Sequence, residues 1–209
     1  MINSTLNVQI RRECILTDSF RALYKKNMSS SKILNHFRIS YKGENGVDAG
    51  GLRTDWFTSL VKELFNPMYG LFISSPNGRT YYPNPNSSIN EQHINYFDFA
   101  GQILARALIE AKYVEANLSL AFYKQLLGYK LSISDLDDMD PLLAKSLKWI
   151  QENSVDSLDI DFTTELESFG DIKMFELIEN GKSTKVTDEN KNIFLKKKIN
   201  FILKKQIKE

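Results

Sequence analysis

The chain has 209 residues, 42% of them hydrophobic, and its 27 basic and 26 acidic side chains leave a formal net charge of +1. This size allows one large domain or a domain with a small appendage, and the balanced charge favours neither nucleic acid nor a membrane surface as partner. No apolar run reaches the roughly 18 residues of a transmembrane segment, no signal-peptide core is present, and the single cysteine excludes an internal disulfide, which favours a cytoplasmic or nuclear setting.

The first third of the chain predicts a helix, a strand and a second helix. The apolar residues of 8–26 can face inward from a helix. Residues 37–41 alternate between apolar and polar side chains, which is typical of a half-buried strand. Apolar side chains then recur at helical spacing over 52–65, and Asn66-Pro67 is expected to end that helix, because the residue before a proline disfavours helical angles.

A glycine-dense turn joins the predicted strand to the second helix, with Gly43, Gly46, Gly50 and Gly51 close together. A phosphate-binding loop is one interpretation of such a turn. However, no Gly-Lys-Ser/Thr follows, the spacing differs from G-x-G-x-x-G, and Asp48 would place a negative charge beside a phosphate. The pattern therefore favours a structural turn.

The middle of the chain predicts a small hairpin and two helices. Short extended pieces at 70–74 and 79–82 are separated by turn residues and are expected to pair. A long helix follows from about Asn90, with apolar side chains spaced for burial on more than one face. A further helix is expected over 118–127, before a glycine.

The last third predicts two helices with extended pieces between them. A helix is expected over 141–152, and residues 158–162 alternate as in a strand. Extended pieces at 174–178 and 183–186 flank an Asn-Gly turn and predict a hairpin. Thr187 precedes the last helix, whose lysine-rich side is expected to be a solvated face.

An acidic run before the helix at 141 could suggest calcium, but its spacing does not fit an EF-hand, and helix capping is the preferred explanation. The two histidines, His36 and His93, have no partner at metal-ligand spacing, so neither a metal site nor a cofactor is predicted. The acidic run before the helix at 141 consists of Asp135, Asp137, Asp138 and Asp140.

The predicted fold is mainly α, of the α+β class, with two parts. Residues 1–140 are expected to form a large helical subdomain with small β-hairpins, and residues 141–209 a smaller α+β subdomain.

Several segments, in this order along the chain, resemble the N-terminal lobe of the HECT ubiquitin-ligase domain, and are most similar to the HECT ligases that carry WW domains. They read GENGVDAGGLRTDWFTSLVKELFNPMYGLF (43–72), NPNSS (84–88), YFDFAGQILARAL (96–108), FYKQLLG (122–128), DLDDMDPLLAKSLKWI (135–150), LDIDF (158–162), ESFG (167–170) and KVTDENKNIF (185–194). The resemblance covers nearly the whole chain and implies a bilobed N-lobe architecture.

The resemblance implies transfer of ubiquitin in two steps. A ubiquitin-conjugating enzyme docks on the small subdomain, and ubiquitin passes to a cysteine in a separate C-terminal lobe and then to a substrate lysine. The resemblance places that cysteine beyond Glu209, so no catalytic residue is expected in this chain, the small subdomain is expected to be truncated, and the chain alone to be inactive. Cys14 is expected to be an unreactive thiol. Substrates would bind through other regions.

The resemblance also implies which residues would contact the conjugating enzyme, through a groove that receives one of its phenylalanines. Lys198 departs from the pattern, because one branch of the family has an aromatic residue at that position. The same residues could instead fill the core of the small subdomain. They are Leu143, Ser146, Leu147, Leu158, Ile160, Phe194 and Lys198.

A second surface would hold a ubiquitin non-covalently, as in the WW-domain-containing ligases. The residues implied are Tyr69, Asn84, Tyr96 and Phe169. Aromatic side chains can anchor apolar surface and an amide can direct a hydrogen bond, although Asn84 could instead shape its own turn. This surface leaves open an alternative function, that of a non-catalytic ubiquitin-binding module.

Overall fold

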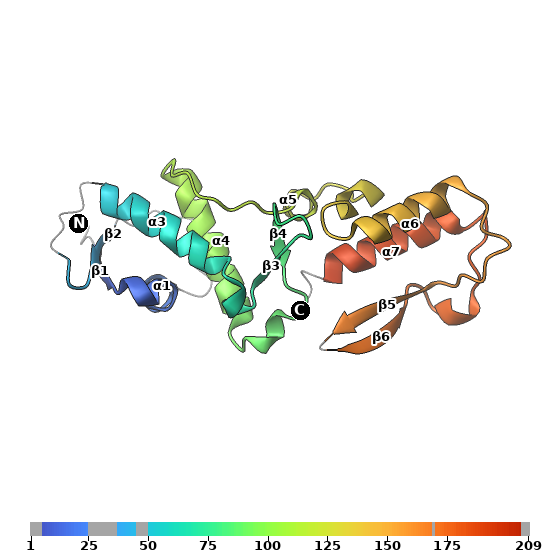
Figure 1. Ribbon diagram of the computed structural model, residues 1–209, viewed down its shortest axis with the longest axis horizontal. Coiled ribbons are helices and arrows are strands. Elements are labelled where there is room, and N and C mark those ends of the chain that lie inside the picture. Colours follow the sequence, from blue (N-terminus) through green and yellow to red (C-terminus); the bar gives the residue numbers. More distant parts are fainter. Residues whose placement is uncertain (1–5, 25–36, 45–49, 169, 206–209) are drawn as a thin grey trace. The chain divides into compact units, whose positions relative to one another are not determined.

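The computed structural model describes residues 6–24, 37–44, 50–168 and 170–205. The chain divides into two compact units (Figure 1), the first formed by residues 1–72 and 87–116 and the second by residues 73–86 and 117–209. The described part contains three two-stranded sheets and is otherwise mainly helical, so the predicted mainly α, α+β class is confirmed. The subdomain boundary expected after residue 140 stays a prediction.

The described part of the first unit begins with a strand, where a helix over 8–26 was predicted. Strand β1 (Leu6–Ile10) pairs in parallel with β2 (Phe37–Tyr41), and only the second part of the predicted segment is helical, as α1 (Ile15–Leu23). The reason is a period of two: Val8 and Ile10 are buried, whereas the residues beside them are exposed. The predicted strand over 37–41 is confirmed.

Two long helices are the largest elements described in the first unit. Helix α3 (Gly51–Leu64) packs against α1 and against α4 (His93–Ile109), and both helices were predicted. Trp56 on α3 is fully buried, and its indole Nε1 donates a hydrogen bond to Ser19 Oγ at 2.9 Å. Gly50, at the start of α3, has a positive φ of 96°, which explains one of the glycines in the turn. Gly46 lies outside the described residues.

The predicted small hairpin is present. Strand β3 (Phe72–Ser74) pairs with β4 (Tyr81–Pro83), and the turn between them is closed by a hydrogen bond from Ser75 N to Thr80 O of 2.8 Å.

The second unit is built on three helices around one apolar core. They are α5 (Leu120–Leu126), α6 (Pro141–Glu152) and α7 (Lys191–Lys205). The Asp140 side chain accepts a hydrogen bond from Leu143 N at 2.9 Å, which confirms the predicted cap of α6. The buried residues of this core are Ala121, Ile133, Leu136, Met139, Ala144, Leu147, Val155, Phe162, Leu177, Val186, Phe194, Leu195, Ile199 and Leu203.

The hairpin of the second unit differs from the predicted one. Strands β5 (Thr163–Ser168) and β6 (Asp171–Glu176) pair antiparallel, and the predicted strand over 158–162 contributes only an isolated bridge at its end. The predicted pairing of 174–178 with 183–186 is wrong. The Asn-Gly turn there does not connect two strands, because it opens a short 3-10 helix, Gly181–Ser183.

Phe162 is the anchor of that 3-10 helix and of the hairpin. Its N–H donates to Gly181 O at 3.0 Å, and its carbonyl accepts from Leu177 N at 2.8 Å. A Cβ on Gly181 would lie 2.5 Å from Phe162 O, so the close approach of the two backbones requires glycine. Sequence spacing alone could not distinguish this use of an Asn-Gly pair from a hairpin turn.

Candidate functional site

The residues expected to form the docking surface come from two segments far apart in sequence, and four of the seven meet in the core of the second unit. Helices α6 and α7 pack against each other there (Figure 1). Leu147 and Phe194 are core residues, each only 1% exposed, while Leu143 and Ile160 are half-buried and pack against the same core. Leu147 and Phe194 thus form a covered floor.

The remaining expected residues lie at the rim. Leu158 is 36% exposed, and Ser146 is exposed, with its hydroxyl donating to Leu142 O at 3.0 Å within the helix. Ser146 therefore has an internal partner already. Leu142 is 79% exposed, although the sequence reasoning did not select it. Its position off the buried stripe of α6 was the signal that could have found it.

Lys198 lies one helical turn after Phe194, and its Nζ is 5.2 Å from the centroid of the Phe194 ring. This distance is within the range of a cation–π contact. The side chain is half-buried, and burial lowers the pKa of Lys198, while the charges of Asp161 and Glu165 act in the opposite direction. Lys198, which was expected to depart from the family pattern, thus places a partly desolvated ammonium over the buried Phe194 ring.

A polar cluster ties the loop that carries Leu158 to the start of α7. The Asp188 carboxylate accepts hydrogen bonds from Ser154 Oγ at 2.5 Å and Val155 N at 3.0 Å. Asp188 N in turn donates to Asp156 Oδ1 at 2.8 Å, and Lys191 Nζ donates to Asn153 O at 2.6 Å. The hydrogen bond from Ser154, followed by those from Val155 and Lys191, lowers the pKa of Asp188.

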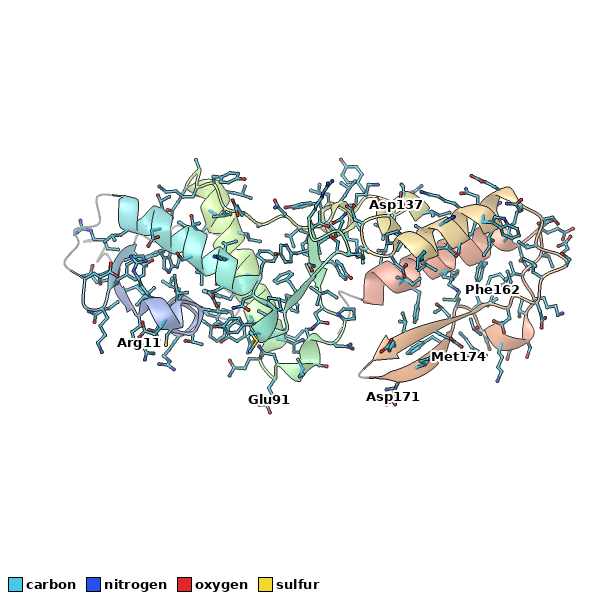
Figure 2. All side chains as sticks on the ribbon, in the orientation of Figure 1. Arg11, Glu91, Asp137, Phe162, Asp171 and Met174 are labelled. Atoms are coloured by element: carbon cyan, nitrogen blue, oxygen red, sulfur yellow. The ribbon has the colours of Figure 1, made fainter. Side chains whose placement is uncertain are left out.

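The acidic run before α6 is explained by capping and ion pairs. Asp135 accepts hydrogen bonds from Ser132 N at 2.7 Å and from Lys124 Nζ at 2.6 Å, and Asp137 forms an ion pair with Lys148 at 2.9 Å (Asp137 is labelled in Figure 2). Burial raises the pKa of Asp135, but the bonds from Lys124 and Ser132 outweigh it and leave the pKa below its usual value. Within the described ranges, no group of three or more potential ligands could hold a metal ion.

The outer face of the hairpin carries exposed apolar side chains that the sequence reasoning missed. Met174 and Ile172 lie on this face of β6, and Figure 2 labels Met174 near the edge of the strand pair. The cross-strand neighbours of these two side chains are Glu165 and Glu167, so the face alternates apolar and acidic groups.

The residues expected to bind ubiquitin are only partly brought together. Tyr96 is half-buried and stacks on Phe20 with ring centroids 4.3 Å apart, and Tyr69 is also half-buried. Burial raises the pKa of Tyr69, with smaller contributions from Glu63 and Tyr96. Both tyrosines belong to the first unit.

Asn84 belongs to the second unit, and its side-chain oxygen accepts a hydrogen bond from Asn86 N at 3.0 Å, so it shapes its own turn. Phe169 lies outside the described residues. Of the four expected residues, Tyr69 and Tyr96 thus belong to the same unit, and each is half-buried.

Cys14 lies at the start of α1 and is half-buried. Its backbone carbonyl accepts a hydrogen bond from Thr17 Oγ1 at 3.1 Å. Of the two histidines, His93 is bonded to Ser87 Oγ at 2.9 Å, and His36 lies outside the described residues. This arrangement gives no support for Cys14 as an activated nucleophile.

The model of the family described as "HECT-domain (ubiquitin-transferase)" matches residues 58–209. The chain belongs to the HECT-domain family. The HECT resemblance predicted from the sequence is therefore confirmed, while the finer likeness to WW-domain-containing ligases stays a prediction. Within the described residues, none of the helices of this HECT chain is long and apolar enough to cross a membrane.

The relatives with similar sequences are named as E3 ubiquitin-protein ligases. An E3 ubiquitin-protein ligase TOM1-like from Neurospora crassa is 40% identical over 193 residues, which cover 91% of this chain and 5% of that protein. The E3 ubiquitin-protein ligase TOM1 of Saccharomyces cerevisiae is 37% identical over 206 residues, covering 98% of this chain and 6% of that protein. The E3 ubiquitin-protein ligase HUWE1 of Mus musculus is 38% identical over 191 residues, which cover 90% of this chain and 4% of that protein. The HECT chain thus spans a small part of the length of these relatives.

Proposed function

We propose that this HECT chain docks a ubiquitin-conjugating enzyme on the second unit, as part of a ubiquitin ligase. The observation that carries the proposal is the convergence of two distant segments of the expected docking surface, 143–160 and 194–198, on one core. The family membership supports the same function, because relatives of this family are named as ubiquitin-protein ligases.

In this proposal the chain supplies binding and orientation. The conjugating enzyme carries ubiquitin as a thioester, and docking holds that thioester where a ligase cysteine can attack its carbonyl. Ubiquitin then moves from that cysteine to the amino group of a substrate lysine. The residues of the second unit make no covalent bond in either step, and their contribution is to raise the local concentration of the charged enzyme.

The rim, rather than the floor, carries the contact with the partner. Leu147 and Phe194 are already buried, so a partner side chain reaches first the half-buried Leu143 and Ile160 and the more exposed Leu158. Burial of such an apolar side chain in an interface is a frequent source of binding energy. The polar cluster around Asp188 supports this role, because it fixes the loop on which Leu158 lies.

The test is a titration of the chain with a panel of purified ubiquitin-conjugating enzymes, in which binding is measured by isothermal calorimetry or fluorescence. Leu158→Glu is expected to weaken binding at least roughly tenfold, because it puts a charge into the contact. Leu127→Glu is the matched control, since Leu127 is an exposed apolar residue at the end of α5, and should change binding less than about twofold. Equal effects of both substitutions would contradict the proposed surface.

A second candidate function is a ubiquitin-binding module, which is favoured by the pair of half-buried tyrosines in the first unit. Tyr69 and Tyr96 both present aromatic surface, and both are partly exposed. An NMR titration with free ubiquitin tests this candidate: Tyr69→Ala should reduce the shift changes, whereas Tyr113→Ala, at an exposed tyrosine after α4, should not.

A further inference from the structure

The Lys198 ammonium covers the aromatic floor of the docking surface. Its Nζ is 5.2 Å from the centroid of the Phe194 ring, and Phe194 itself is buried. The ammonium therefore lies over one side of the ring. The proposed docking surface is consequently not a plain apolar groove but an apolar rim around a cation.

This cation is poorly compensated. In the part of the chain that the structure describes, Nζ forms neither a hydrogen bond nor an ion pair within 4.0 Å. The nearby Asp161 uses its Oδ1 to accept from Thr163 N at 3.0 Å and Thr163 Oγ1 at 2.5 Å. Glu165 influences Lys198 only through its charge. A half-buried ammonium without an acceptor loses hydration that no protein group replaces.

We infer that Lys198 is a specificity-determining residue of the docking surface, which selects partners that bring an oxygen acceptor next to their apolar contact. The inference rests on the proposed docking of a conjugating enzyme. An acceptor placed against Nζ forms a charge-assisted hydrogen bond and restores the lost solvation. A partner that buries Lys198 under apolar surface alone leaves the ammonium unpaired and pays its full desolvation.

The acceptor can come from a partner carboxylate or from a backbone carbonyl, which offer the same oxygen chemistry. A carboxylate adds attraction to the ammonium but is opposed by the charges of Asp161 and Glu165. A carbonyl meets less of this repulsion. Binding through a carboxylate depends on the charge of Lys198 and on an acidic residue of the partner, whereas binding through a carbonyl needs only a donor at position 198. Variants of the two proteins can therefore distinguish these sources.

The test uses the full chain and the tightest-binding member of a panel of purified ubiquitin-conjugating enzymes. Lys198→Met keeps an unbranched stem over Phe194 and removes the donor, and is expected to weaken binding roughly tenfold or more. Lys197→Met makes the same chemical change at the exposed neighbouring position and should alter binding less than about twofold. Thermal unfolding of both variants checks that the fold is retained.

Two further arms identify the acceptor. Lys198→Gln retains a neutral donor and should keep most of the affinity if the acceptor is a carbonyl. If the acceptor is a carboxylate, one Asp→Asn or Glu→Gln substitution in the conjugating enzyme should weaken its binding to the wild-type chain. The same substitution should have no effect on binding to Lys198→Met. A carboxylate also predicts that binding by the wild-type chain weakens more steeply with salt than binding by Lys198→Met.

The outcomes separate this inference from the proposed function. If Leu158→Glu weakens binding but Lys198→Met binds as tightly as the wild type or more tightly, only the inference about Lys198 is overturned. If Leu158→Glu leaves binding unchanged, the docking surface itself is wrong. If no enzyme of the panel binds the wild-type chain, both are overturned.

Discussion

Glu110, the C-cap residue of α4, binds Arg53 on α3, with Arg53 Nε donating to Glu110 Oε2 at 2.6 Å. Arg106 donates to the same carboxylate at 3.0 Å. Both guanidinium groups also lie over the Phe37 ring of β2, each 4.1 Å from its centroid. One carboxylate thus holds two cations that clamp an aromatic side chain, and it joins the sheet of the first unit to both of its long helices.

Glu110→Gln should destabilise the first unit by about 2–4 kcal/mol, because it removes the charge of a carboxylate that two largely buried guanidinium groups share. Urea unfolding of the variant measures this difference. Glu115→Gln, at an exposed position after α4, is the matched control and should change stability by less than about 0.5 kcal/mol. A loss below 0.5 kcal/mol for Glu110→Gln would contradict the clamp.

Acid should weaken the second unit through Asp135. The folded-state pKa of Asp135 is lowered by Lys124 and Ser132 despite burial, so the unfolded state binds a proton more readily. The corresponding stability is present above the ordinary carboxyl pKa of about 3.9 and is lost as the pH falls through the lower folded value. Asp135→Asn should lower stability at neutral pH and flatten the pH dependence below about 4.5. Chemical unfolding at several pH values, with the exposed Asp137→Asn as control, measures this.

Gly181→Ala should destabilise the second unit by about 1–3 kcal/mol, since the added Cβ would lie 2.5 Å from Phe162 O and one backbone must move. Gly101→Ala is the contrasting substitution. Gly101 is exposed inside α4 with no atom within 4 Å of an added Cβ, so alanine should stabilise the helix by up to about 1 kcal/mol. Thermal unfolding of both variants should show opposite shifts.

Asp188→Ala should loosen the loop after α6, because the carboxylate holds both Ser154 and Val155. Hydrogen exchange should become faster at the Val155 amide. Binding of a conjugating enzyme should weaken, although no residue of the rim is substituted. Glu189→Ala removes the adjacent, exposed carboxylate and should leave both measurements unchanged. Unaltered exchange at Val155 would show that the loop is held by other contacts.

The sequence predicted the longer helices of this HECT chain well because each has its own local signals. Helix α6 begins at Pro141 and ends at Glu152, as expected from its cap and its apolar spacing. The first strand was missed because Val8 and Ile10 were included in a longer helical pattern, and the two periods are hard to separate over five residues. The partner strand of β1 is also distant in sequence.

The composition of the candidate site stays a prediction, and the exposure of its residues could not be predicted from the sequence. The resemblance selected Leu147 and Phe194, yet their burial depends on the packing of α6 on α7, which local patterns do not specify. The position of Lys198 over Phe194 follows from their spacing of four on a helix, so this contact was accessible to sequence reasoning. That Lys198 Nζ has no hydrogen-bond acceptor within the described residues could not be predicted, because it depends on the hydrogen bonds between Asp161 and Thr163.

The hairpin β5–β6 leaves the core at Phe162 and returns at Leu177, and these two residues are joined by a backbone hydrogen bond. The hairpin is therefore closed at its base, and Phe175 of β6 packs on Phe201 of α7 with ring centroids 5.3 Å apart. Such a closed hairpin is expected to tolerate insertion, shortening or replacement of its tip, beyond these contacts, while the core of the second unit keeps its shape. The tip of the hairpin is thus the natural place in this unit to attach a label or a tether.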